Sequence, residues 1–253
     1  IFDCLVGSEM CIRDRSEEEL RKKLNNDFYS RRIVQIEQSC PPEENLAKQV
    51  GWRSYNSQQE NFQFLADVLA DVANIDWSDT NTSVLDIGCG LGELLRYLRQ
   101  KKEFQGKYTG IDILDDFIKM GSKLQSNDNR NYFISSDVLS YEWKDSQYDF
   151  VLSIGSVATN YDYPEPYGKK TLEFAFKLVN LMCQLSRKYA GLHYINEKKY
   201  SPEEIIANRD LAFYDPHDIE EMFIKATSGN YKKLITKAVP GNREAKLITS
   251  ICF

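Results

Sequence analysis

The chain has 253 residues, with 32 Lys and Arg against 38 Asp and Glu, which gives a net charge of −6. This length suits one large α/β domain or two small ones, and the acidic balance disfavours a protein that coats nucleic acid. The sequence lacks the apolar run of about 20 residues that a membrane helix needs, and its composition is neither collagen-like nor that of a disordered chain. Six scattered cysteines without a CxxC spacing, and only two histidines, predict a cytoplasmic protein without a metal site.

The first fifteen residues, IFDCLVGSEMCIRDR, begin at Ile1 rather than at a methionine. The stretch from Cys4 to Arg15 can be back-translated into a DNA sequence that resembles a transposase-type sequencing adapter, translated in one reading frame. We therefore interpret residues 1–15 as derived from an adapter and exclude them from the fold. Acidic residues within this stretch also argue against a signal peptide.

Residues 16–56 are predicted to form a helical lead-in. Ser16 and Glu19 have the spacing of a capping box, which predicts a helix from Ser16 to Gln38. Pro41-Pro42 ends that segment. Apolar residues then recur at i, i+3 and i+4 spacing, which predicts an amphipathic helix from about Ser57 to Ala73.

From residue 83 onward, short β-rich runs alternate with helical runs. This alternation predicts right-handed crossovers and a doubly wound, mostly parallel sheet. The predicted strands are 83–87, 108–113, 132–135, 150–154 and 191–195, and the predicted helices are 93–101, 115–124 and 170–189.

The C-terminal part departs from this alternation. Asp215-Pro216 predicts the start of a helix that reaches about Ala226. Strands at 232–239 and 245–253 are joined by a short link, which permits only an antiparallel hairpin. We therefore expect an α/β domain over residues 57–253, whose sheet has seven strands with the last one antiparallel.

A glycine-rich turn follows the first predicted strand of the sheet, in the order Asp86-Ile87-Gly88-Cys89-Gly90-Leu91-Gly92. Glycines let the backbone adopt positive φ and approach a ligand closely, and an acid in the strand can fix the loop or meet a cationic group. The dinucleotide fingerprint would place its third glycine at position 93, where this chain has Glu93. A pyrophosphate site is therefore disfavoured.

The pattern Asp86-x-Gly88-x-Gly90-x-Gly92 is similar to motif I of the class I S-adenosylmethionine-dependent methyltransferases. The resemblance covers roughly residues 49–253 and implies a Rossmann-like fold with S-adenosylmethionine (SAM) as the cofactor. It places Asp112 where the family's second-strand acid binds the ribose hydroxyls, and Asp137 where the third-strand acid contacts the adenine amino group. The fourth strand, ending at Ser153-Ile154, resembles motif IV. The cofactor-binding residues that the resemblance implies are Asp86, Gly88, Cys89, Gly90, Gly92, Asp112, Ile113, Asp137, Val138, Ser153 and Ile154.

The segment Gly51-Trp52-Arg53-Ser54-Tyr55, followed by Gln58-Gln59, looks like the lead-in that folds over the cofactor in many of these enzymes. Arg53 is a candidate for the methionyl carboxylate, with a surface ion pair as the alternative. Trp52 and Tyr55 are equally compatible with ordinary core packing.

The resemblance implies in-line displacement at the sulfonium methyl, which requires an aligned nucleophile and exclusion of water but no metal. A hydroxyl acceptor would also need a general base. Residues near the expected face are Tyr161, Asp162 and Tyr163 after the fourth strand, and His193 with Asn196 at the fifth. His193 also suits a packed strand histidine, so Tyr161 and His193 are weak catalytic candidates and no base is assigned.

The fourth strand ends in Ser153-Ile154-Gly155-Ser156, without the Pro-Pro-aromatic motif of exocyclic-amine nucleic-acid methyltransferases. The Pro-Cys nucleophile of cytosine-C5 enzymes is also missing. We therefore expect methyl transfer to an oxygen or nitrogen of a small molecule, with the aromatic insert 160–168 overhanging the pocket. The alternatives are a SAM-binding module or partner subunit without activity and, less favoured, an NAD-dependent oxidoreductase.

Overall fold

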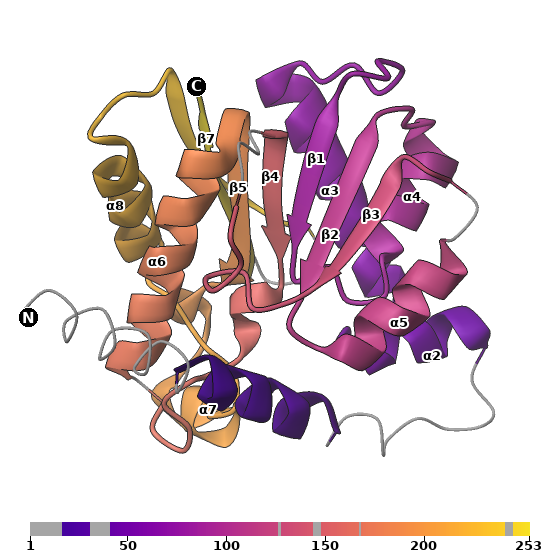
Figure 1. Ribbon diagram of the computed structural model, residues 1–253. Helices are drawn as coiled ribbons and strands as arrows, with labels where there is room; N and C mark the ends of the chain where they lie inside the picture. The colour runs from indigo at the N-terminus through magenta and orange to yellow at the C-terminus, as the bar shows by residue number, and fades with distance from the viewer. Residues whose placement is uncertain (1–16, 31–40, 126–127, 144–147, 167, 241–244) are drawn as a thin grey trace, which may run out of the picture.

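The computed structural model describes residues 17–30, 41–125, 128–143, 148–166, 168–240 and 245–253. A seven-stranded sheet with the order β3-β2-β1-β4-β5-β7-β6 forms its centre (Figure 1). All strand pairs are parallel except those of β7, which runs antiparallel to both β5 and β6. The strands are β1 Ser83–Ile87, β2 Lys107–Asp112, β3 Asn131–Ser135, β4 Tyr148–Ile154, β5 Ser186–Ile195, β6 Lys233–Ala238 and β7 Lys246–Cys252. This confirms the predicted doubly wound sheet with its last strand antiparallel.

Helices cover both faces of the sheet, and each face has its own apolar core. One core cluster joins the sheet to α6 and α8, and the other joins it to α3 and α4. Because successive strand residues point to opposite faces, Leu85 lies in the first cluster and Val84 in the second. The helices are α2 Pro42–Gln49, α3 Tyr55–Ala73, α4 Glu93–Lys102, α5 Asp115–Leu124, α6 Lys169–Leu185, α7 Pro202–Ala207 and α8 Pro216–Thr227.

The strand order reverses beside β1, which has β2 on one side and β4 on the other. In open α/β sheets, ligands bind in the crevice outside the carboxyl ends of the strands at such a point. Figure 1 shows three segments below these ends, namely α2, α7 and the helical residues 17–30, which we call the N-terminal helix. Phe28 and Tyr29 of the N-terminal helix, Lys48 of α2 and Asn208, which follows α7, line a cavity at this edge.

The predicted helix over residues 170–189 is too long, because α6 ends at Leu185 and β5 begins at Ser186. Tyr189 pairs with Phe150 of β4 and is fully buried, so strand pairing overrides a local pattern that is compatible with a helix. The predicted helix over residues 16–38 is helical over 17–30, and its remaining residues lie outside the described ones.

Two short helices, α2 and α7, were not predicted. Each begins with a proline in its first turn, Pro42 in α2 and Pro202 in α7, which is a favoured position for this residue. In the region that the structure describes, no helix is both long enough and apolar enough to cross a membrane.

Candidate functional site

Two cavities lie at the carboxyl ends of the strands. The larger one, which we call the main cavity, has a volume of about 610 Å³ and extends from the glycine loop after β1 to β5 and β7. The smaller one, the second cavity, has about 60 Å³ and lies beside the ends of β2 and β3. Both are lined by Gly88 and Asp112, so they meet at the glycine loop.

The glycine loop has a backbone that side chains would obstruct. Gly88, Gly90 and Gly92 have φ values of 72°, 53° and 73°, which lie in the left-handed region. A Cβ atom on Gly88 would also clash with the side chain of Ser156. The amides of Gly88 and Cys89 both donate to the carbonyl of Ile111, at 2.8 and 3.1 Å, which fixes the loop against β2.

Asp86 lies in the main cavity wall at the end of β1 and is 3% exposed. Its carboxyl group accepts a hydrogen bond from the Tyr108 hydroxyl at 2.6 Å. Burial raises the pKa of Asp86 to about 7, the Tyr108 hydrogen bond opposes this rise, and the nearby charge of Asp112 adds to it. A cationic ligand group beside Asp86 would favour its ionised form.

Asp112 ends β2 and holds the loops on both sides of it. Its Oδ2 accepts from the Gly90 amide and its Oδ1 from the Leu114 amide, each at 2.9 Å. Burial raises the pKa of this carboxyl group, although the backbone hydrogen bonds lower it. The side chain therefore presents a preoriented acceptor to both cavities.

The second cavity contains Asp137, Val138, Ile113 and Tyr161, but the N-terminal helix fills much of the space beside them. Arg21 Nε donates to Asp137 Oδ2 at 2.6 Å, and both side chains are buried. Asn25 of the same helix donates to the Tyr161 hydroxyl at 3.1 Å. The remaining volume holds only a few water molecules.

His193 of β5 lines the opposite end of the main cavity and is 3% exposed. Asn61 of α3 donates its Nδ2 to the Ser57 carbonyl at 2.6 Å, so its Oδ1 is the atom that lies 2.9 Å from His193 Nε2. Nε2 must then carry the hydrogen, which leaves a lone pair on Nδ1. Nδ1 is buried and has no hydrogen-bond partner among the described residues. Burial, reinforced by the charge of Lys246, lowers the pKa of His193 well below its ordinary value, which keeps the ring neutral.

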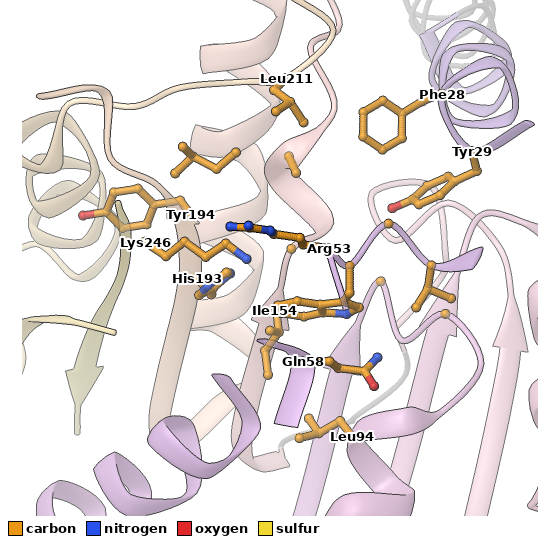
Figure 2. Close-up of a pocket in the computed structure, with 18 of the residues that line it drawn as sticks. Phe28, Tyr29, Arg53, Gln58, Leu94, Ile154, His193, Tyr194, Leu211 and Lys246 are labelled. Carbon is orange, nitrogen blue, oxygen red and sulfur yellow. The ribbon is translucent and has the colours of Figure 1, made fainter. Parts of the chain in front are cut away.

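Two further polar side chains line the main cavity. The buried Gln58 amide of α3 has no partner for either its oxygen or its nitrogen among the described residues. Lys246 of β7 lies with its Nζ 4.5 Å from the centre of the Trp52 ring. Figure 2 shows His193, Lys246 and Arg53 directed into the same part of the cavity, with Gln58 closer to Leu94 of α4. Unpaired polar groups at a cavity wall are suited to bind a polar ligand.

The structure brings most of the residues that the sequence singled out to these two cavities. The main cavity is lined by Arg53, Asp86, Gly88, Cys89, Gly90, Asp112, Ile154 and His193, and the second by Gly88, Asp112, Ile113, Asp137, Val138 and Tyr161.

Gly92 and Ser153 line neither cavity. Gly92 precedes α4 and packs against the Phe133 ring, and Ser153 is fully buried in a hydrogen bond with Ser156. Both residues therefore lie behind the cavity walls and affect the site only through the residues that they contact.

The insert 160–168 does not overhang the main cavity as predicted: among its described residues, Tyr161 alone lines a cavity, the second one. Asp162 instead accepts from the Thr171 amide at 2.8 Å, in the first turn of α6. Tyr163 is partly exposed, Asn196 caps a short turn after β5, and His217 is exposed beside Glu221. Tyr167 lies outside the described residues.

Sequence reasoning did not single out Lys246, Asn61 or Arg21. The lysine that begins the otherwise buried and largely apolar strand β7 was a signal for Lys246, because such a strand normally holds apolar residues. For Asn61 and Arg21 no local signal exists, since their partners lie 132 and 116 residues away.

A family model described as a methyltransferase domain matches residues 84–177, the segment that contains the glycine loop, Asp112 and Asp137. The chain is 37% identical over 98 residues to a protein-lysine N-methyltransferase, EFM4, of Saccharomyces cerevisiae, a match that covers 38% of this chain and 42% of that protein. It is 35% identical over 74 residues to a phosphoethanolamine N-methyltransferase of Plasmodium falciparum, covering 29% and 27% respectively. The matched stretches thus span less than half the length of either relative.

The solved structure of magnesium protoporphyrin IX methyltransferase from Synechocystis PCC 6803, with bound SAH, has the same fold. The TM-score is 0.60 at 14% identity, over 92% of this chain and 99% of that one. Residues 84–177 thus match a methyltransferase domain, and the sheet order and glycine loop give the chain the fold of the class I S-adenosylmethionine-dependent methyltransferases.

Proposed function

We propose that the protein transfers the methyl group of SAM to a nitrogen or oxygen atom of a small molecule. The observation that carries this proposal is the continuous main cavity, which has acidic residues and a glycine loop at one end and His193 with Lys246 at the other. Its volume of about 610 Å³ lies in the range of small-molecule sites. One end suits the cofactor and the other an acceptor.

The residues of the cofactor end fit the polar groups of SAM. Asp86 would meet the methionyl ammonium group, and the unpartnered Gln58 amide would meet the methionyl carboxylate. Arg53, which is directed into the part of the cavity that holds His193 and Lys246, would meet that carboxylate where the two ends of the cavity join. Asp112 would accept from the ribose hydroxyls and Asp137 from the adenine amino group. These assignments extend the motif resemblance to side chains that line the two cavities.

When bound, SAM supplies a methyl group that its sulfonium already activates. The chain therefore has to align the nucleophile, exclude water and accept a proton. Trp52 and Ile154 line the main cavity and would shield the reacting atoms from solvent. Among the described residues that line the main cavity, His193 has an unpaired Nδ1 lone pair that is suited to accept a proton.

The test is calorimetric titration of SAM, its demethylated product S-adenosylhomocysteine (SAH), and NAD into the protein. We expect SAM and SAH to bind and NAD not to bind. Asp112→Ala should weaken SAH binding at least tenfold, whereas Asp116→Ala, on an exposed position of α5, should leave it unchanged. Binding of NAD alone, or of none of the three, would contradict the proposal.

A second measurement separates an enzyme from a SAM-binding module without activity. Methyl-labelled SAM is incubated with the protein and a panel of small amines, alcohols, carboxylic acids and phosphate esters, with purified proteins as a parallel panel. Labelled small molecules support the proposal. Label found only on protein would contradict a small-molecule acceptor. It would agree instead with a protein acceptor, as in the name of the yeast relative.

A further inference from the structure

The acceptor end of the main cavity holds a cation, Lys246, that no acidic side chain among the described residues neutralises. In the antiparallel pair of β5 and β7, Lys246 lies opposite Ile195, so it shares a face of the sheet with His193. Its Nζ lies over the Trp52 ring, and none of the described carboxylates pairs with it. By contrast, the buried Arg21 has Asp137 as its partner.

The environment of Lys246 is unfavourable for a free ammonium group. Burial lowers its pKa to about 8, and within the described part of the chain no acidic residue offsets this effect. At neutral pH the side chain is still mainly charged, so the folded protein keeps a desolvated positive charge at a cavity wall. Such a charge is a strong partner for an anion, since desolvation strengthens the ion pair.

His193 adds a second requirement for a ligand at this end. Its Nδ1 lone pair is buried and can only accept a hydrogen bond, because Asn61 fixes the hydrogen on Nε2. A molecule that satisfies both residues carries an anionic group for Lys246 and a hydroxyl or amine hydrogen for His193.

We propose that the methyl acceptor is a small molecule with a carboxylate or phosphate group, which pairs with Lys246 Nζ while its hydroxyl or amine donates to His193 Nδ1. This inference rests on the proposed function and names its substrate class. As the acceptor's oxygen or nitrogen forms its bond to the methyl carbon, the carbon–sulfur bond breaks and its electron pair stays on sulfur. The acceptor's proton passes to His193 Nδ1. A lysine side chain is a poorer acceptor here, because its positive charge would lie beside that of Lys246.

The experiment measures anion binding directly, with inorganic phosphate and succinate as probes and the neutral succinamide as the uncharged match. Each is titrated calorimetrically into the free protein and into the protein saturated with SAH, at constant ionic strength. Lys246→Met removes the charge and Lys246→Arg keeps it. Lys233→Met is the matched control, because Lys233 is exposed on the neighbouring β6 and lies outside the main cavity.

We expect phosphate or succinate to bind the SAH complex saturably and succinamide not to bind. Lys246→Met should weaken anion binding at least tenfold, whereas Lys246→Arg and Lys233→Met should retain it. Equal binding by Lys246→Met and the unchanged protein, or no anion binding by the SAH complex, would overturn the inference. Displacement of the anion by SAH would also overturn it, because the cation would then serve the cofactor's own carboxylate.

The same titrations distinguish a failure of this inference from a failure of the proposed function. If SAH does not bind, the proposed function fails, and the anion titrations of the free protein still decide whether Lys246 forms an anion site. If SAH binds and the anions do not, the cofactor assignment stands and the acceptor class is wrong.

Discussion

Asp86 is a buried carboxyl group whose protonation links stability to ligand binding. Its pKa in the folded protein, about 7, lies above the ordinary value of 3.8, so between these values the folded chain binds more protons than the unfolded chain. Stability contributed by the protonated group is therefore present at low pH and is lost as the pH rises towards 7. The ionised form that a cationic ligand needs is the form that the free protein tolerates least.

We predict that Asp86→Asn raises the melting temperature of the free protein at pH 8 by several degrees, because it removes the buried negative charge. The same change should weaken SAH binding at least tenfold at that pH. For the unchanged protein, SAH affinity should fall as the pH drops below 7. Thermal unfolding and calorimetry across pH 6–8 measure both effects, and a lower melting temperature at pH 8 would contradict this account.

His193 should remain neutral with its hydrogen on Nε2, because burial lowers its pKa and Asn61 accepts from Nε2. Nitrogen-15 NMR resolves this tautomer directly, and the chain has only two histidines, so the exposed His217 provides the second signal. Asn61→Leu should abolish the fixed tautomer and lower kcat more than it changes the KM for the acceptor. An Nδ1–H tautomer in the unchanged protein would argue against His193 as the proton acceptor.

At the scale of single residues, the sequence predicts those that act within one local motif. Asp86 and the glycines lie within seven residues, and their spacing alone brings them to one loop. Asn61 reaches His193 only because α3 packs on β5, so no local pattern identifies it. Gln58 was visible as part of the lead-in, but its lack of a partner is a property of the fold.

The N-terminal helix forms one wall of the second cavity. Arg21 occupies Asp137, the residue that we assign to the adenine amino group, and Asn25 lies against Tyr161. Since only about 60 Å³ remains beside them, an adenine ring requires this helix to shift. Hydrogen exchange over residues 17–30 should therefore change when SAH binds.

Arg21→Ala should destabilise the free protein, because the buried carboxylate of Asp137 loses its cation, a change worth about 3–5 kcal/mol in buried pairs. The rise in melting temperature on adding SAH should be larger than in the unchanged protein, since no ion pair has to break. Lys22→Ala is the control, because its ion pair with Asp115 is exposed and contributes little. Equal effects of both substitutions would contradict the assignment of Arg21.

Most elements are predictable because apolar periodicity and turn residues agree along the chain, as in β1 and α5, whose bounds match the prediction. The boundary between α6 and β5 is not predictable from the sequence, since no glycine or proline separates the two elements. There, pairing with β4 and β7 decides where the helix ends.

In the whole molecule, the two ends of the sheet have different roles. The carboxyl ends of the strands form the proposed binding site, and the amino ends contribute to stability. At the amino ends of the strands, Asp149 of β4 accepts from the amide and hydroxyl of Ser83 at 3.0 and 2.9 Å and pairs with Lys188 of β5. Burial raises the pKa of Asp149, but these partners outweigh that effect and leave it below its ordinary value. Its stabilising contribution is therefore present above pH 3.8 and is lost as the pH falls through the lowered pKa.

Asp149→Ala should lower the free energy of unfolding by about 1–2 kcal/mol, because the half-buried amide and hydroxyl of Ser83 and the Lys188 ammonium lose their acceptor. SAH affinity should stay within twofold of the unchanged protein, since Asp149 lies at the end of the sheet opposite to the cavities. Denaturant unfolding and calorimetry on the same preparation test the contrast with Asp86→Asn. A large loss of SAH affinity at full stability would contradict this division.

The methyltransferase match ends at residue 177, within α6, whereas His193 and Lys246 belong to β5 and β7. The proposed donor and acceptor sites are thus encoded in successive parts of the gene, although they share one cavity. Mutations in the last strands can alter the acceptor end while the glycine loop and its acids stay intact. Proteins with this arrangement can therefore change their methyl acceptor through substitutions in β5 and β7 while they keep the same methyl donor.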